Sequence, residues 1–122
     1  MYSYVYCFIF AQMNEDFFTK WTSQLKKGTL SFLVLCVLKD KREYYGYDLI
    51  HEIRKKTGTE IAEGTLYPLM NRLKKENLVV SKWVEQKSGI PRKYYTITSL
   101  GIDTCNEMKK YWDHLNTTIN AL

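Results

Sequence analysis

The sequence predicts a mainly α-helical fold with one small β-hairpin, and three observations lead to this prediction. Apolar residues recur at helical spacing in four separate segments. Two shorter segments near residue 90 instead alternate in character and are rich in β-branched and aromatic residues. No internal repeat, low-complexity tract or Pro/Gly/Ser-rich linker interrupts the 122 residues, so the segments are expected to form one compact unit.

The first helix is expected over residues 21–39. Apolar residues recur on one side of it at i, i+3, i+4, i+7 and i+8, and these are Leu30, Leu33, Val34, Val37 and Leu38. Phe32, Leu35 and Cys36 add apolar residues on the other side. A helix that is apolar nearly all round must be buried on two faces. In a chain of this length, the second face is expected to meet a partner subunit.

The second helix is expected over residues 45–57, with Tyr47, Ile50 and Ile53 as its inward stripe. Residues 61–62 follow as a connector or a small strand.

The third helix and the hairpin come next. The helix is expected over residues 63–77, and its inward stripe fits the i, i+3, i+4, i+7 template with Leu66, Leu69, Met70 and Leu73. Strands are expected at residues 78–85 and 92–98. Because residues 86–91 between them are rich in turn formers, the two strands should pair as a hairpin.

A final helix is expected over residues 99–121. Six apolar residues follow one another at spacings of 3, 4, 3, 4 and 3, namely Cys105, Met108, Trp112, Leu115, Ile119 and Leu122. This is an a/d heptad seam, so we expect the segment 99–122 to form a dimer interface from Met108 onward. The alternative is that the seam packs on the first helix of the same chain, and both can hold for different faces.

Three helices followed by a hairpin are the order of a winged helix-turn-helix. In that architecture the helix before the hairpin enters the major groove and the hairpin contacts the DNA backbone or minor groove. When the apolar stripe of the third helix faces inward, its opposite face carries Gly64, Thr65, Pro68, Asn71, Arg72 and Lys75. Arg and Asn can read base edges and Lys and Thr can hold phosphates, while the small Gly64 and Pro68 allow close approach.

The placement of charge agrees with this assignment. The chain has a net charge of +5, and residues 63–98 contain seven basic and three acidic residues, so most of the excess lies there. Basic residues on an exposed face can also be merely solvated. For Arg72, Lys75, Arg92 and Lys93 together we favour contact with double-stranded DNA.

Four motifs resemble those of the PadR family of regulators, in the order that the family has them. They are LKKGTL at 25–30, YGYDLI at 45–50, EGTLYPL at 63–69, and PRKYY at 91–95 followed by TSLG at 98–101. The match covers about residues 25–115 and leaves out the first twelve. It implies a cytoplasmic winged-helix homodimer, of the short branch, that binds a pseudo-palindromic operator. It also implies repression of a nearby gene that a small ligand relieves.

The resemblance also implies roles for individual residues. It places Tyr67, Arg72 and Lys75 in the DNA-reading helix. Together with the groove-facing and wing residues, the predicted DNA-binding set is Gly64, Thr65, Tyr67, Asn71, Arg72, Lys75, Lys87, Arg92, Lys93 and Tyr95. Trp112 matches an aromatic position that stacks planar drugs across the dimer axis in some short members, with Met108 beside it. Plain packing at the interface is the alternative for Trp112.

Enzymatic and metal-binding functions find no support in the sequence. His51 and His114 lie in separate helices without the spacing of a metal or nucleophile site, and no phosphate-binding loop or catalytic motif occurs. Cys7, Cys36 and Cys105 form no CxxC pair, so we expect buried, reduced thiols, no metal and no cofactor. A winged helix used for protein–protein contact, with its basic face solvated, is the rival function.

The first twelve residues stand apart from the rest. They lack the basic region of a signal peptide and are too short to span a bilayer, so no membrane association is expected. Aromatic residues at every second position fit a strand, while Met13 before a polar stretch fits an over-extended start codon. The predicted organisation is therefore a leader at 1–12, a DNA-binding domain at 13–98 and a dimerisation helix at 99–122.

Overall fold

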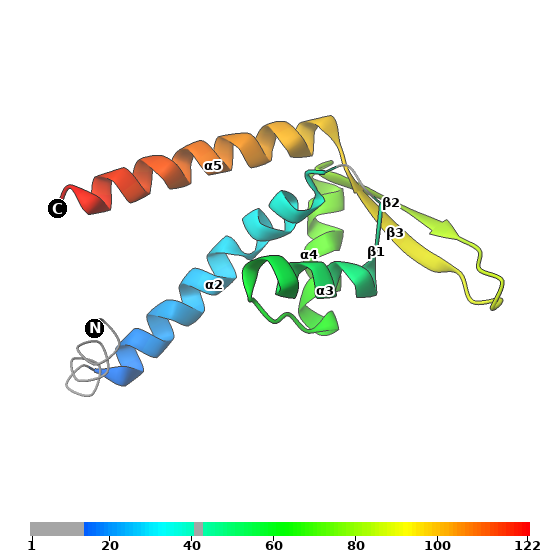
Figure 1. Cartoon of the computed structure of the whole chain (residues 1–122), viewed down its shortest axis with the longest axis horizontal. Helices are drawn as coiled ribbons and strands as arrows, with labels where there is room; N and C mark the ends of the chain where they lie inside the picture. Colours follow the sequence, from blue (N-terminus) through cyan, green and yellow to red (C-terminus); the bar gives the residue numbers. More distant parts are fainter. Residues whose placement is uncertain (1–13, 41–42) are drawn as a thin grey trace. The chain divides into compact units, whose positions relative to one another are not determined.

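The fold combines helices of 12 to 24 residues with a small sheet, and a computed structural model describes residues 14–40 and 43–122. The predicted leader and Cys7 lie outside the described residues. In chain order the elements are α2 (Glu15–Leu38), β1 (Tyr44–Tyr45), α3 (Gly46–Thr57), α4 (Glu63–Lys75), β2 (Val79–Val84), β3 (Arg92–Ile97) and α5 (Ser99–Asn120) (Figure 1). The chain divides into two compact units, with the boundary inside α2 between Leu30 and Ser31.

Helix α2 begins at Glu15 rather than at residue 21. The Asn14 side chain caps this end, because its Oδ1 accepts a hydrogen bond of 3.0 Å from the Phe17 amide. Glu15 and Asp16 in the first turn also favour the positive end of the helix dipole. These polar signals extend the helix beyond the part that apolar periodicity alone could detect.

The core of the unit Ser31–Leu122 is built around the apolar stripe predicted for the third helix. Leu66, Leu69, Met70 and Leu73 of α4 are all buried, as expected. The end of α2 contributes Val34, Leu35, Val37 and Leu38. The expectation that α2 would be buried on two faces is only partly met, because Leu35 is fully buried while Cys36 is exposed.

The inward stripe predicted for α3 was right at Ile53 and wrong at Tyr47. Gly46, Leu49 and Ile53 are the buried residues of this helix, whereas Tyr47 is 50% exposed. The Tyr47 ring instead packs edge-on against His51 at the surface, with ring centroids 4.8 Å apart. The ring of Tyr67 on α4 lies directly over Gly46, which leaves no room for a larger residue at this position.

A strand that the sequence analysis missed completes the sheet. Residues Tyr44 and Tyr45 form β1, which pairs antiparallel with β3 and places it in the middle of the order β1-β3-β2. The small strand considered for residues 61–62 is absent, and that segment is an irregular connector into α4. Tyr44 and Tyr45 are aromatic residues, which suit a strand, and they pair with the edge of β3 that β2 leaves free.

The predicted hairpin is present with a regular register. Strands β2 and β3 pair antiparallel from Val79 opposite Ile97 to Val84 opposite Arg92. In the loop between them, Gly89 adopts a φ of +84° and its amide donates a hydrogen bond of 2.9 Å to the Gln86 carbonyl. The hairpin extends away from α3 and α4, with its loop at the far end (Figure 1).

The start of α5 is joined closely to the end of the α4–β2 turn. The Thr98 hydroxyl caps α5 by accepting from the Gly101 amide at 2.9 Å, and it donates to the Asn77 carbonyl at 2.7 Å. A Cβ on Gly101 would overlap the carbonyl oxygen of Leu78 and lie 2.6 Å from Ile97 Cγ1. Only glycine therefore lets α5 leave β3 at this angle.

Among residues 14–40 and 43–122, none of the helices has both the length and the hydropathy needed to cross a membrane.

Two helical glycines should respond to alanine in opposite ways. Gly101→Ala forces an overlap with backbone and should lower the free energy of unfolding by about 1–3 kcal/mol. Gly28→Ala meets nothing within 4 Å in the middle of α2 and should raise it by about 0.5–1 kcal/mol. Denaturant unfolding followed by circular dichroism measures both, and equal stabilities would contradict the packing described at Gly101.

Candidate nucleic-acid interface

The face of α4 opposite its buried stripe is open to solvent. It consists of Gly64, Thr65, Pro68, Asn71, Arg72 and Lys75, all of which are exposed. A Cβ added to Gly64 would meet nothing within 4 Å, so glycine here is not required by packing. Because the buried stripe fixes the rotation of the helix, these small, polar and basic residues are presented together along one side.

At the loop end of the paired strands, an arginine is held against an aromatic ring. The Arg92 guanidinium carbon lies 4.7 Å from the centroid of the Tyr45 ring, a cation–π contact. Tyr45 is in turn paired across the sheet with Tyr94, and their ring centroids are 6.1 Å apart. The missed strand β1 therefore supplies the surface on which Arg92 rests.

Lys93 lies in an unusual environment for a lysine. Its ammonium is 5.6 Å from the centroid of Trp83, which is directly opposite it in the hairpin and is 66% exposed. Partial burial lowers the pKa of Lys93, and the positive charge of the neighbouring Lys74 lowers it further. The two ammonium groups repel each other, so an anion bound between them would be stabilised.

These residues line one hollow between α4 and the hairpin. Its volume is about 390 Å³. The lining residues are Tyr45, Tyr67, Asn71, Trp83, Pro91, Arg92, Lys93 and Tyr95. The structure thus brings together Asn71 and Tyr67 from α4 with Arg92 and Lys93 from β3, as a single concave surface with basic groups and aromatic walls.

Tyr67 connects this hollow to the core. Its ring covers Gly46, where a Cβ would lie 2.7 Å from the Tyr67 hydroxyl oxygen. Burial, followed by the nearby Glu63 and Tyr45, raises the pKa of Tyr67 above its usual value. The hydroxyl therefore stays protonated at neutral pH and is available as a hydrogen-bond donor.

Tyr95 lines the hollow but is almost completely buried. It is 1% exposed and is the largest fully buried side chain of the described core. Alternation along β3 turns Tyr95 and Ile97 inward, and Tyr95 pairs with both neighbouring strands, opposite Tyr44 and Ser81. Burial raises its pKa. Its burial indicates that it supports the hairpin from beneath, and its contact with DNA stays a prediction.

The remaining predicted positions lie outside the hollow. Arg72 and Lys75 are exposed on α4, and Lys87 is exposed in the hairpin loop. The sequence analysis overlooked Tyr45 and Trp83. Counting the hairpin register outward from its turn would have placed Trp83 opposite Lys93, whereas Tyr45 could not be found without the pairing of β1.

The seam on α5 divides into a buried start and an exposed remainder. Cys105 is 1% exposed, Met108 is half-buried, and every residue from Lys109 to the end is exposed. The exposed apolar residues at seam positions are Trp112, Leu115, Ile119 and Leu122. A row of apolar side chains this long, left open on a single chain, is typical of an interaction surface.

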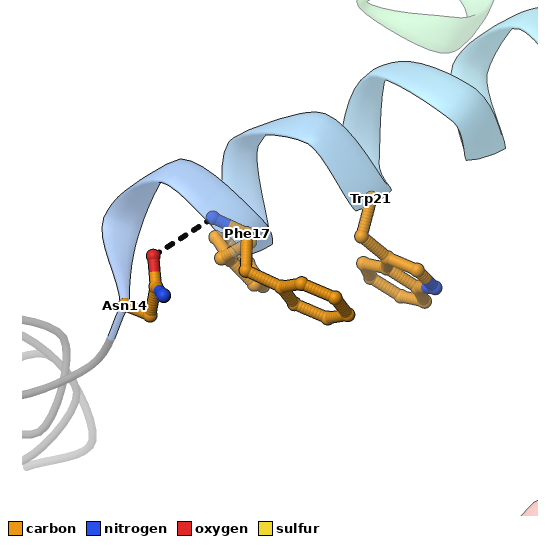
Figure 2. A pocket seen from close by; sticks show the side chains of 4 residues that line it. Asn14, Phe17 and Trp21 are labelled. Carbon is orange, nitrogen blue, oxygen red and sulfur yellow. Dashed lines mark hydrogen bonds between the residues drawn. The ribbon is translucent and has the colours of Figure 1, made fainter.

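A second exposed apolar cluster lies at the start of α2, in the unit that ends at Leu30. Phe17, Phe18 and Trp21 surround an open hollow of about 350 Å³, together with the capping Asn14 (Figure 2). Phe17 and Trp21 are 70% and 49% exposed. The cluster was not identified from the sequence, because the first helix was predicted to begin only at residue 21.

Within the part of the chain that the structure describes, no group of three or more His, Cys, Asp or Glu side chains is arranged to hold a metal ion.

Comparison with known proteins gives one consistent result. Residues 34–107 match the transcriptional regulator PadR-like family. The solved structure of a PadR-like transcription factor from Bacteroides fragilis is 38% identical, with a TM-score of 0.71 over 84% of this chain and 97% of that one. A PadR family transcriptional regulator from Eggerthella lenta is 34% identical, with a TM-score of 0.77 over 88% and 92%. An uncharacterized protein of Lysinibacillus sphaericus is 33% identical over 80% of this chain and 91% of its own length.

The repulsion between the ammonium groups of Lys93 and Lys74 can be tested directly. Lys74→Met removes the neighbouring positive charge, so the pKa of Lys93 should rise, but not fully to its usual value because burial is the larger cause. NMR titration of isotopically methylated lysines reads this pKa. Lys75→Met, on the outer face of α4, is the matched control and should leave it unchanged. An identical Lys93 pKa in wild type and Lys74→Met would contradict the arrangement.

Proposed function

Because the chain belongs to the PadR-like family of transcriptional regulators, we propose that it represses a nearby gene by binding a pseudo-palindromic operator as a homodimer. The observation that carries this proposal is the hollow in which α4 and the hairpin present basic and hydrogen-bonding groups together. A winged helix-turn-helix places these same two elements on DNA.

Helix α4 is proposed to enter the major groove. Its exposed residues divide naturally by chemistry: Arg72 suits guanine and Asn71 suits adenine, while Lys75 and Thr65 suit phosphates. Gly64 has open space around it, so the first turn of the helix can approach the DNA backbone closely. Sequence preference would then depend mainly on Arg72 and Asn71.

The hairpin is proposed to bind the adjacent backbone. Arg92 rests on Tyr45 and needs little further ordering to meet a phosphate or the minor groove. A phosphate near Lys93 would offset its repulsion by Lys74 and raise the lowered pKa of Lys93. Lys87 in the exposed loop would add a further contact, and each such contact releases counterions and makes binding depend on salt.

The dimer is proposed to form through the exposed seam of α5. Trp112, Leu115 and Ile119 lie on one stripe of this helix and have no cover within the described chain. A two-fold axis through this seam would present two copies of α4, with half-sites about one helical turn or a multiple of it apart.

A small aromatic effector is the finer part of the proposal. Trp112 is 40% exposed, near the start of the open seam and next to the half-buried Met108. Two such indoles facing each other across an axis could close on one another or admit a flat ring between them. Glu107 and Asp113 lie within about a turn and would favour a cationic ring. Movement of the indoles would change the spacing of the reading helices.

Two single substitutions on α4 should weaken operator binding in different ways. Arg72→Ala should cost about 1–3 kcal/mol of binding free energy and relax the preference for one base pair. Lys75→Ala should instead reduce, by about one and for all DNA sequences, the slope of log affinity against log salt concentration. Fluorescence anisotropy with DNA from upstream of the gene, at several salt concentrations, measures both. Lys55→Ala, on exposed α3, is the control. If both variants bind like the control, α4 is not the reading helix.

The same titration separates this function from a winged helix that contacts proteins. A DNA-binding role requires wild-type affinity to fall steeply as salt rises. A flat salt dependence with weak binding would favour the protein-contact alternative.

Acidic residues in the α5 seam should dissociate the dimer. Leu115→Asp combined with Ile119→Asp would bury unpaired carboxylates, at a cost of several kcal/mol. Light scattering after gel filtration should then give the mass of one chain. The control, Thr117→Asp with Asn120→Asp, adds the same charge to the other side of the helix and should stay dimeric. A dimer in the seam variant would exclude this surface as the interface.

A further inference from the structure

Two cysteines from different helices meet inside the unit Ser31–Leu122. The Sγ atoms of Cys36 on α2 and Cys105 on α5 are 3.5 Å apart, although the residues are 69 positions apart in the sequence. Cys105 is 1% exposed, whereas Cys36 as a residue is exposed at the surface. Buried, reduced thiols were expected from the sequence, and the structure shows that Cys36 and Cys105 form a part-buried pair.

The separation of the two sulfurs fits a shared thiophilic atom. A disulfide would need them about 2.05 Å apart, so the present contact is between two thiols. Two sulfurs bound to one soft atom at about 2.3 Å each, with an angle near tetrahedral, lie roughly 3.5–3.8 Å apart. The pair therefore needs almost no movement to act as a two-point ligand.

The surroundings restrict what that atom can be. A structural zinc ion takes four protein ligands, and in the described part of the chain no third His, Cys, Asp or Glu completes such a group. The occupant must therefore bring its remaining substituent with it and require two thiols only. Monosubstituted trivalent arsenic, R–As(OH)₂, meets this requirement, because it carries one carbon substituent and two exchangeable hydroxides.

We propose that Cys36 and Cys105 form a binding site for monosubstituted trivalent arsenicals. Each thiol condenses with one arsenic-bound hydroxide, so that two As–S bonds form, two As–O bonds break and two waters leave. No electrons are transferred, and both thiol protons leave in the waters. The site uses none of the residues proposed to contact DNA, so it stands or fails independently of that function.

The protonation state of Cys36 explains why the pair stays available for this reaction. Burial, followed by the contact with Cys105, raises the pKa of Cys36 to about 12, and the nearby Lys39 and Lys109 offset this only in part. Cys36 is therefore a neutral thiol at neutral pH. Thiolates, not neutral thiols, attack peroxides, so oxidation of this pair should be slow. Condensation with an arsenic hydroxide instead carries the proton away with the leaving group.

The test uses the full chain and phenylarsine oxide, which hydrates to the R–As(OH)₂ form. Cys7→Ser is the background, because it removes the third thiol. Native mass spectrometry should show one phenylarsenic group bound per chain with loss of two waters, and thiol titration should show that both remaining thiols are consumed. A small dithiol should remove the group, and a monothiol at the same concentration should not.

Cys36→Ser and Cys105→Ser, each in this background, should bind on the order of 100-fold more weakly, since one attachment point is lost. Cys36→Ser is the decisive variant, because the residue is exposed and its loss leaves the core unchanged, which circular dichroism checks. Wild-type affinity in Cys36→Ser would overturn the proposal. So would two free thiols after one equivalent of the arsenical, or a disulfide already present in freshly purified protein.

Discussion

The antiparallel pairing of β3 on both of its edges is the constraint on which the rest of the structure depends. On one edge β3 pairs with β1, which leads directly into α3, and on the other with β2, which follows α4. Tyr95 stands at the crossing point, buried and opposite Tyr44 and Ser81. The hairpin is therefore attached to both α3 and α4, and its orientation relative to α4 is set by hydrogen bonds rather than by a flexible link.

This attachment creates the hollow and decides its chemistry. Because β1 lies beside β3, Tyr45 comes under Arg92, and because β2 lies on the other side, Trp83 comes under Lys93. Aromatic rings hold Arg92 and Lys93 in place without neutralising them, and the pKa of Lys93 is lowered by burial and further by the positive charge of Lys74. In the proposed function, a polyanion would supply the missing negative charge, which would give a physical reason for a basic surface to be assembled at a cost in the free chain.

Close contacts between elements rely on the absence of a side chain at two glycines. Gly46 gives room to the ring of Tyr67, and Gly101 gives room to the carbonyl of Leu78. The first contact joins α3 to α4, and the second joins α5 to the end of the α4–β2 turn. A change in the position of α5, through its exposed seam, would therefore reach the reading helix over a short and rigid path.

The sequence by itself determined the elements whose signals are local. Periodicity placed the buried stripe of α4, and with it the exposed face that carries Arg72 and Lys75, while alternation around a turn placed the hairpin. Only the tertiary structure decided the features that depend on distant partners. The strand at Tyr44–Tyr45 needed the free edge of β3, Tyr95 was buried because the face of β3 that it shares with Ile97 packs onto the core, and Cys36 met Cys105 because two helices bring them together. A local pattern shows which residues share a face, but what covers that face depends on residues far away in the chain.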